Sequence, residues 1–407
     1  MRNTTRREWL SLASLAVAGF ATRSANAQDA SSRIAQVVRD YEAQGFHRTA
    51  TGVDQSSASW LVEQVRLSGL QATLESFPVS RVDPIVTRLE GGGRRIEGLP
   101  LFDGAFTEPS GVDGRIGPLN SETEIGLTET AVNAAATGAL GDARRANRHR
   151  AIVAVTKGRR PGLCPSNADE FLTPLGPPVL QVSSEEAAWL TEQATRGSQV
   201  RVVANVVRNA TSASNVVAEL NGSDLALPPL VVMTPRSGWY WCASERGGGI
   251  ACWLEIMRGL RETPLKRSVL FVASSGHELG HLGIDAFIEK RPGIVTRAAA
   301  WLHLGANIGA ATELDNNLLQ ARDDEMDRAL GGAMAKAGLR VARRAPRNNV
   351  PAGEAEAVHR GGGRYVSAIG GNQLFHNLAD RGPGAVDPQA IANFSQAFME
   401  VIRSLSV

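Results

Sequence analysis

The histidines and carboxylates of the C-terminal half are the residues most able to do acid–base or metal chemistry. The segment His277-Glu278-Leu279-Gly280-His281 has HExxH spacing. On a helix, this spacing points both histidines at one Zn²⁺ and leaves the glutamate to activate water. Here the motif directly follows an apolar run and contains Gly280. We therefore expect His277 and Glu278 on a strand-to-helix turn, and His281 as an ordinary residue near a helix start.

Other polar side chains also follow apolar runs. They lie in the segments 234–239, 244–246 and 375–380, and at His303. In open α/β sheets, sites form at the carboxyl ends of the strands. The sequence therefore predicts that four residues far apart in the chain converge in space: Glu245, Glu278, His303 and His376.

The elements that position these residues have an α/β pattern from residue 214 onward. Apolar runs that predict buried strands lie at 215–220, 229–233, 268–273 and 298–304, and helical stretches lie at 247–260 and 280–290. Strands that are apolar throughout and alternate with helices are typical of a parallel sheet covered on both faces. We expect an α/β fold whose mixed, mostly parallel sheet is flanked by helices.

The middle of the chain has a different texture. Residues 31–70 show helical periodicity, whereas residues 76–212 contain short apolar runs between Gly- and Pro-containing turns, with one helical stretch at 185–195. We predict one α/β domain made of residues 28–75 and 213–407, interrupted by a β-rich insert at 76–212.

Residues 1–27 have the pattern of an export signal. Arg2, Arg6 and Arg7 precede an apolar stretch at 9–21, and Ala25-Asn26-Ala27 gives a small-x-small cleavage site before Gln28. The Arg6-Arg7 pair favours a twin-arginine signal, with an ordinary secretory signal as the alternative. The expected location is periplasmic or secreted. No other stretch has 18 consecutive apolar residues, so no membrane span is expected after cleavage.

Composition excludes some classes of function. The 407 residues carry a formal net charge of +2, and the arginine pairs are scattered, so nucleic-acid binding is not expected. The three cysteines are Cys164, Cys242 and Cys252, an odd number that allows at most one internal disulfide. None has CxxC spacing, which disfavours a cysteine zinc site. The sequence does not indicate which of them pair, or the oligomeric state.

One segment carries a family resemblance. Residues 215–222, Asn-Val-Val-Ala-Glu-Leu-Asn-Gly, resemble the NVIAELPG strand of bacterial zinc aminopeptidases in metallopeptidase family twenty-eight. That family also includes glutamate carboxypeptidase and the non-catalytic transferrin receptor. The resemblance implies a zinc-exopeptidase-like α/β fold, a protease-associated-like insert at 76–212, and hydrolysis of peptides.

The resemblance also implies a two-zinc site with five ligands, which this chain has partly changed. The first histidine ligand falls at Met233 or Thr234 and is absent. The bridging aspartate of the family falls at Glu245, the general base at His277 and the next ligand at Glu278. A further aspartate ligand falls at His303. The late histidine falls at His376, with Asp380 after it. Metal ligation is thus expected at Glu245, Glu278, His303 and His376.

Arg236 follows the missing ligand position and brings a fixed positive charge that opposes a second cation. We therefore expect one zinc ion rather than two, or none. Three functions remain open: a zinc-dependent aminopeptidase-like hydrolase acting on peptides or small amides; a binding protein on the same scaffold; and a metal-independent hydrolase or cyclase using Arg236, His277 and Glu278.

Overall fold

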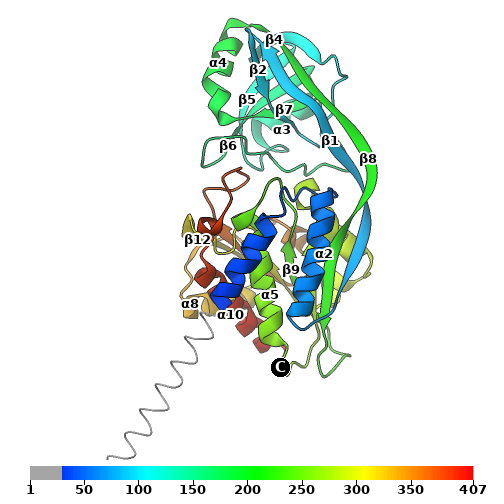
Figure 1. The fold of residues 1–407 in the computed structure, drawn as a ribbon, viewed down its shortest axis with the longest axis vertical. Coiled ribbons are helices and arrows are strands. Elements are labelled where there is room, and N and C mark those ends of the chain that lie inside the picture. Colours follow the sequence, from blue (N-terminus) through cyan, green and yellow to red (C-terminus); the bar gives the residue numbers. More distant parts are fainter. Residues whose placement is uncertain (1–29, 407) are drawn as a thin grey trace, which may run out of the picture.

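The computed structural model describes residues 30–406, so the proposed signal peptide at 1–27 lies outside the described residues. Figure 1 shows an α/β part and a β-rich part that are joined by two long neighbouring strands, β1 (Ala72–Gly91) and β8 (Gln199–Leu220). These strands pair antiparallel from Ala72 opposite Ala218 to Gly91 opposite Val200, with one bulge after Pro84.

The centre of the α/β part is a group of parallel strands. They are β9 (Leu230–Pro235), β10 (Val269–Ser274), β11 (Ala300–Leu304) and β14 (Tyr365–Gly371), in the spatial order β14-β11-β9-β10. On one side, β10 pairs antiparallel with the C-terminal end of β8. On the other side, β12 (Glu313–Ala321) is antiparallel to β14, and β13 (Val341–Arg344) is parallel to β12 at the edge.

Helices cover both faces of this sheet because its strands are apolar on both sides. One face packs against a helix at residues 30–42, α2 (Gly52–Leu67), α5 (Gly248–Leu260), α8 (Asp324–Lys336) and α10 (Pro388–Leu405). The other face packs against α6 (Leu282–Glu289), α7 (Ile294–Arg297) and α9 (Ala355–Arg360). This arrangement confirms the predicted α/β fold with a mixed, mostly parallel sheet flanked by helices.

The β-rich part has its own core, formed by side chains of β1, β8 and the elements that lie between these two strands in the sequence. Its strands are β2 (Arg94–Glu97), β3 (Leu99–Pro100), β4 (Val112–Pro118), β5 (Ile125–Ala131), β6 (Ala151–Lys157) and β7 (Val179–Val182). Its helices are α3 (Gly138–Ala146) and α4 (Ala187–Arg196), with the 3-10 turn η1 (Ser184–Glu186) before α4. Strand β4 pairs with the N-terminal end of β8, so the two sheets are connected through this strand.

Two features bear on expectations from the sequence. All three cysteines are buried and free. Within residues 30–406, no helix combines the length and the apolar character needed to cross a membrane.

The chain enters α5 through the π-helical turn η2 (Ala243–Gly247) and three consecutive glycines. A Cβ atom on Gly248 would lie 2.0 Å from the carbonyl oxygen of Ile308, and one on Gly249 would lie 2.8 Å from Thr234 Oγ1. The glycines therefore let α5 approach the ends of β9 and β11 closely, which places η2 at the carboxyl edge of the sheet.

We predict opposite effects for two helical Gly→Ala substitutions. Gly248→Ala should lower the free energy of unfolding by about 1–3 kcal/mol because the added methyl group overlaps the Ile308 carbonyl. Gly332→Ala is the matched control: Gly332 is an exposed residue of α8 with no atom within 4 Å of an added Cβ. It should raise the free energy by about 0.5–1 kcal/mol through helix propensity. Urea titration followed by circular dichroism measures both; equal effects would contradict the close-approach argument.

Candidate active site

The carboxyl ends of β9, β10 and β11 meet at one edge of the sheet. Ser274 at the end of β10 is opposite Pro235 of β9, and His303 of β11 is opposite Met233 of β9. The 3-10 turn η3 (His277–Leu279) follows β10, and His281 lies just before α6 with a φ of 64°. The two histidines of the HExxH segment therefore do not share a helix, although their ring centroids are 5.0 Å apart.

A buried glutamate, Glu354, joins two of the predicted histidines. His277 Nδ1 lies 2.9 Å from Glu354 Oε1, and His303 Nε2 lies 3.1 Å from Glu354 Oε2. His303 Nδ1 also lies 2.9 Å from Ser367 Oγ, so both of its ring nitrogens have partners. His277 Nε2 has no hydrogen-bond partner within residues 30–406, and this atom is not fully buried. This nitrogen is therefore open to the cavity that His277 lines.

The charges around Glu354 favour its ionised form. Burial raises the pKa of this carboxyl, but His277, His303 and His281 outweigh burial and hold the pKa well below its usual range. Burial, and then the Arg246 cation, lower the pKa of His277. Burial also lowers the pKa of His281, to about 3. At neutral pH, His277 is thus a neutral imidazole that donates Nδ1–H to a carboxylate and presents Nε2 as a base.

A second group of charges lies on η2 and the loop before η4 (Pro383–Ala385). Glu245 Oε1 is 2.8 Å from Arg246 Nη2 and 3.4 Å from His376 Nε2. All three side chains are buried, and these three atoms lack a hydrogen bond of acceptable geometry in the described chain. Burial raises the pKa of Glu245, but Arg246 and then His376 outweigh it and lower the pKa below its ordinary value.

Asp380 fixes the start of η2. Its carboxylate accepts hydrogen bonds from Ser244 N at 2.9 Å, Ser244 Oγ at 2.6 Å and Glu245 N at 2.9 Å. Burial raises the pKa of Asp380 to about 6, against the lowering effect of the Ser244 hydrogen bonds. The resemblance placed an acid at this position, and here it orients the turn that carries Glu245.

Glu278 and Arg236 take part in internal contacts instead of facing the cavity. Glu278 accepts hydrogen bonds from Thr49 N at 2.5 Å and Ser237 Oγ at 2.8 Å. Arg236 forms a buried ion pair with Asp54, 2.8 Å from Nη1 to Oδ1. The structure thus brings the side chain of Glu245 next to that of His376, whereas His303 contacts Glu354. It ties both Glu278 oxygens to neighbouring donors.

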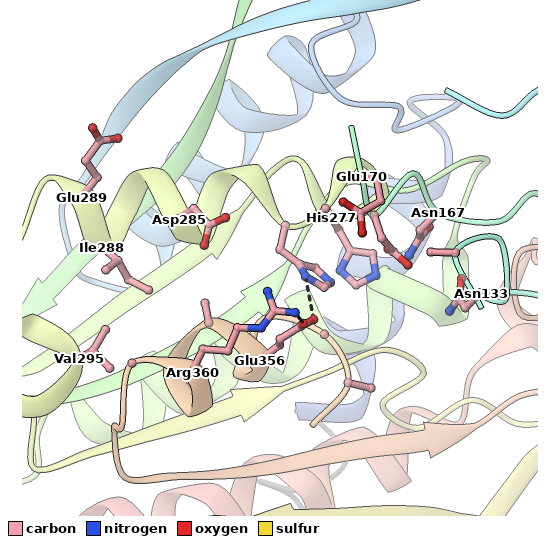
Figure 2. Close-up of a pocket in the computed structure, with 18 residues that line it drawn as sticks. Asn133, Asn167, Glu170, His277, Asp285, Ile288, Glu289, Val295, Glu356 and Arg360 are labelled. Carbon is pink, nitrogen blue, oxygen red and sulfur yellow. Dashed lines mark ion pairs between the residues drawn. The ribbon is translucent and has the colours of Figure 1, made fainter. Parts of the chain in front are cut away.

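Figure 2 shows a cavity between α6 and α9, with Asn133, Asn167 and Glu170 of the β-rich part near His277. Its volume is about 730 Å³. Five carboxylates line it, at Asp169, Glu170, Asp285, Glu289 and Glu356, against a single guanidinium, Arg360, which is paired with Glu356. The cavity therefore favours a ligand that carries positive charge.

The donors at this edge do not fit a two-zinc centre. Thr234 is one of the two positions, with Met233, at which the resemblance places a histidine ligand, and its buried Oγ1 has no hydrogen-bond partner among the described residues. Each oxygen of Glu278 accepts a hydrogen bond, and both ring nitrogens of His303 have hydrogen-bond partners. Across residues 30–406, no group of three or more His, Cys, Asp or Glu side chains is arranged to hold a metal ion. Zinc sites in proteins use three or four protein ligands, and of the four predicted ligands only Glu245 and His376 keep a ligating atom without a hydrogen bond within residues 30–406.

Comparisons with known proteins agree with the fold. No family model matches the chain. A segment of 257 residues is 23% identical to aminopeptidase YwaD of Bacillus subtilis, covering 61% of this chain and 55% of that protein. The chain thus spans about half the length of this curated relative.

Two solved structures are similar over nearly the whole chain. A zinc aminopeptidase from Bacillus subtilis has a TM-score of 0.75 at 16% identity, covering 93% of this chain and 94% of that one. A peptidase M28 precursor from Shewanella amazonensis has a TM-score of 0.73 at 15% identity, covering 93% and 95%. The chain has the fold of the zinc aminopeptidases, and the resemblance found in its sequence is confirmed at this level.

Glu354 was not identified from the sequence. It lies after Gly353, in a loop-like segment with one other acid, Glu356, and no spacing links it to His277 or His303. Gly353 has a φ of 72°, and a Cβ atom there would lie 2.9 Å from His303 Cε1. A glycine directly before an acid at a helix start was the one available signal.

We predict that Glu354 determines the tautomer of His277. Glu354→Gln should remove the carboxylate that accepts from Nδ1–H and leave His277 as a mixture of tautomers, detectable in ¹⁵N NMR spectra of the imidazole. Glu354→Ala should lower the free energy of unfolding by about 3 kcal/mol because it breaks a buried charged network. Glu356→Ala is the control, since its pairs with His281 and Arg360 are partly exposed; the loss should stay below about 1 kcal/mol. An unchanged His277 spectrum in Glu354→Gln would contradict the assignment.

Proposed function

We propose that this chain is an exported aminopeptidase-like hydrolase that cleaves peptide or small amide bonds in the cavity beside His277. One observation carries the proposal. A neutral histidine, at the position that the family resemblance gives to the general base, has Nδ1 on a buried carboxylate and Nε2 toward the cavity. The fold of the zinc aminopeptidases and the sequence match to aminopeptidase YwaD support the same reaction class.

The chemistry assigned to this chain's own residues is proton transfer. His277 Nε2 would take a proton from the attacking water, and the ionised Glu354 would stabilise the imidazolium that forms. The proton would then pass to the departing amine. The carboxylates of the cavity would hold a substrate ammonium group, which suits a substrate with a free N-terminus.

His277 substitutions test this proposal. His277→Ala should lower kcat/KM on aminoacyl-amidomethylcoumarin or dipeptide substrates by about 10²–10⁴-fold, the usual contribution of a general base. His359→Ala is the matched control, because His359 contacts Arg322 and Tyr365 outside the cavity and should leave turnover unchanged. Equal activity of His277→Ala and wild type would exclude His277 as the base.

Restoring the glutamate of the family needs a second change. His277→Glu alone would place two carboxylates within contact of each other at Glu354 and raise the pKa of one of them. The double variant His277→Glu/Glu354→Gln removes this repulsion. The double variant should therefore have a higher kcat/KM than His277→Glu alone.

A binding protein on the same scaffold is the second candidate. The observation that favours it is that Glu278, His303 and Arg236 are all engaged in internal contacts. For the same reason, a hydrolase or cyclase using Arg236, His277 and Glu278 retains only His277 from its set. Purified wild type with no turnover on any free-amine peptide, but with saturable peptide binding, would favour the binding protein.

Export through the twin-arginine route is part of the proposal. Arg6→Lys/Arg7→Lys should keep the precursor in the cytoplasm, while Arg2→Lys should not. Mass spectrometry of the exported protein should give Gln28 as the first residue. Normal export of the double-lysine variant would assign the segment to the general secretory route.

A further inference from the structure

We infer that the Arg246 guanidinium is the permanent cation of the Glu245–His376 pair, in the place where the resemblance puts a metal ion, and that it excludes zinc from this position. The first support is contact. Arg246 Nη2 is 2.8 Å from Glu245 Oε1, and its Nε donates to the Ser237 carbonyl at 2.7 Å, so the group is fixed at two points.

The second support is the arrangement of hydrogen-bond acceptors. His376 Nδ1 lies 2.5 Å from the carbonyl oxygen of Pro165 and must donate to it. Nε2 of the same ring faces Glu245 Oε1 at 3.4 Å, and neither atom has a hydrogen bond of acceptable geometry within residues 30–406. A buried carboxylate such as Glu245 needs a positive charge beside it. Arg246 supplies this charge, and its side chain is buried against Glu245.

The third support is charge balance. Glu245 carries one negative charge and Arg246 one positive charge, so the fully buried pair is neutral. A Zn²⁺ added beside this pair would give the three groups a net charge of +2 in a buried position, with Glu245 and His376 as its two ligands. Zinc and Arg246 are therefore mutually exclusive at Glu245.

Replacing the guanidinium tests the inference. Arg246→Gln keeps an amide donor and removes the charge. Because Glu245 and His376 supply two ligands, we expect this variant to bind more zinc than wild type when both are equilibrated with the same free zinc concentration, and to gain a zinc-dependent rise in Tm. Wild type should retain no zinc in this position, and its Tm should not respond to zinc or to EDTA. Adding His376→Ala to Arg246→Gln should abolish the gain.

Arg144→Gln is the matched control. Arg144 is also fully buried and pairs with Asp103 at 2.6 Å, but it lies in the β-rich part, away from any histidine of the site. It should lose stability to a similar extent without acquiring zinc, which separates loss of a buried ion pair from creation of a metal site.

Two outcomes would overturn the inference. One is a folded Arg246→Gln that binds no more zinc than Arg144→Gln. The other is a wild-type protein that retains zinc and loses it on His376→Ala; this measurement stands even if Arg246→Gln does not fold. Zinc content and Tm are read without substrate, so the result is independent of whether the proposed hydrolase activity is found.

Discussion

The charge of Arg246 is the constraint on which the rest of the site depends. A guanidinium with no access to solvent must be neutralised and hydrogen-bonded, since an unpaired buried charge costs several kcal/mol. Glu245 and the Ser237 carbonyl meet this need. To bring them together, Asp380 fixes the π-helical turn η2, and glycines let α5 approach the ends of β9 and β11. The positive charge of Arg246 also lowers the pKa of His277, in the neighbouring cluster with Glu354, and so helps to keep this imidazole neutral.

Ser237 connects the two clusters. Its carbonyl accepts from Arg246, and its hydroxyl donates to Glu278 while accepting from the backbone N–H groups of Gly276 and His277. Glu278 is thus an anchor for the turn that presents His277. At the position where the resemblance places a metal-ligating carboxylate, Glu278 supports the turn that carries the proposed base His277. Both oxygens of Glu278 accept hydrogen bonds, from Thr49 N and Ser237 Oγ, so this carboxylate positions the turn.

The sequence was sufficient to predict the α/β fold and the edge of the sheet at which polar residues gather. Apolar strands are recognisable locally, and parallel strands bring their carboxyl ends to one edge whatever the loops contain. It was not sufficient for the partners of these residues. The bonds from Glu354 to His303 and from Thr49 to Glu278 join positions 51 and 229 residues apart, and no local pattern encodes them. The length of β8 was also missed, because its middle is too polar to be recognised as a strand.

The β-rich part contributes directly to the site, which explains why the cavity lies where it does. The segment at 161–169 reaches the α/β part and is held there by hydrogen bonds from Tyr240 Oη to Leu163 O, from Trp239 Nε1 to Asn167 Oδ1, and from Ala168 N to Glu278 O. The Pro165 carbonyl also accepts from His376. Asp169, the last residue of this segment, and Glu170 after it line the cavity. One short segment therefore sets the orientation of His376 and supplies part of the negative wall beside His277. A displacement of the β-rich part would change both at once, which couples the geometry of the buried charge pair to the shape of the cavity.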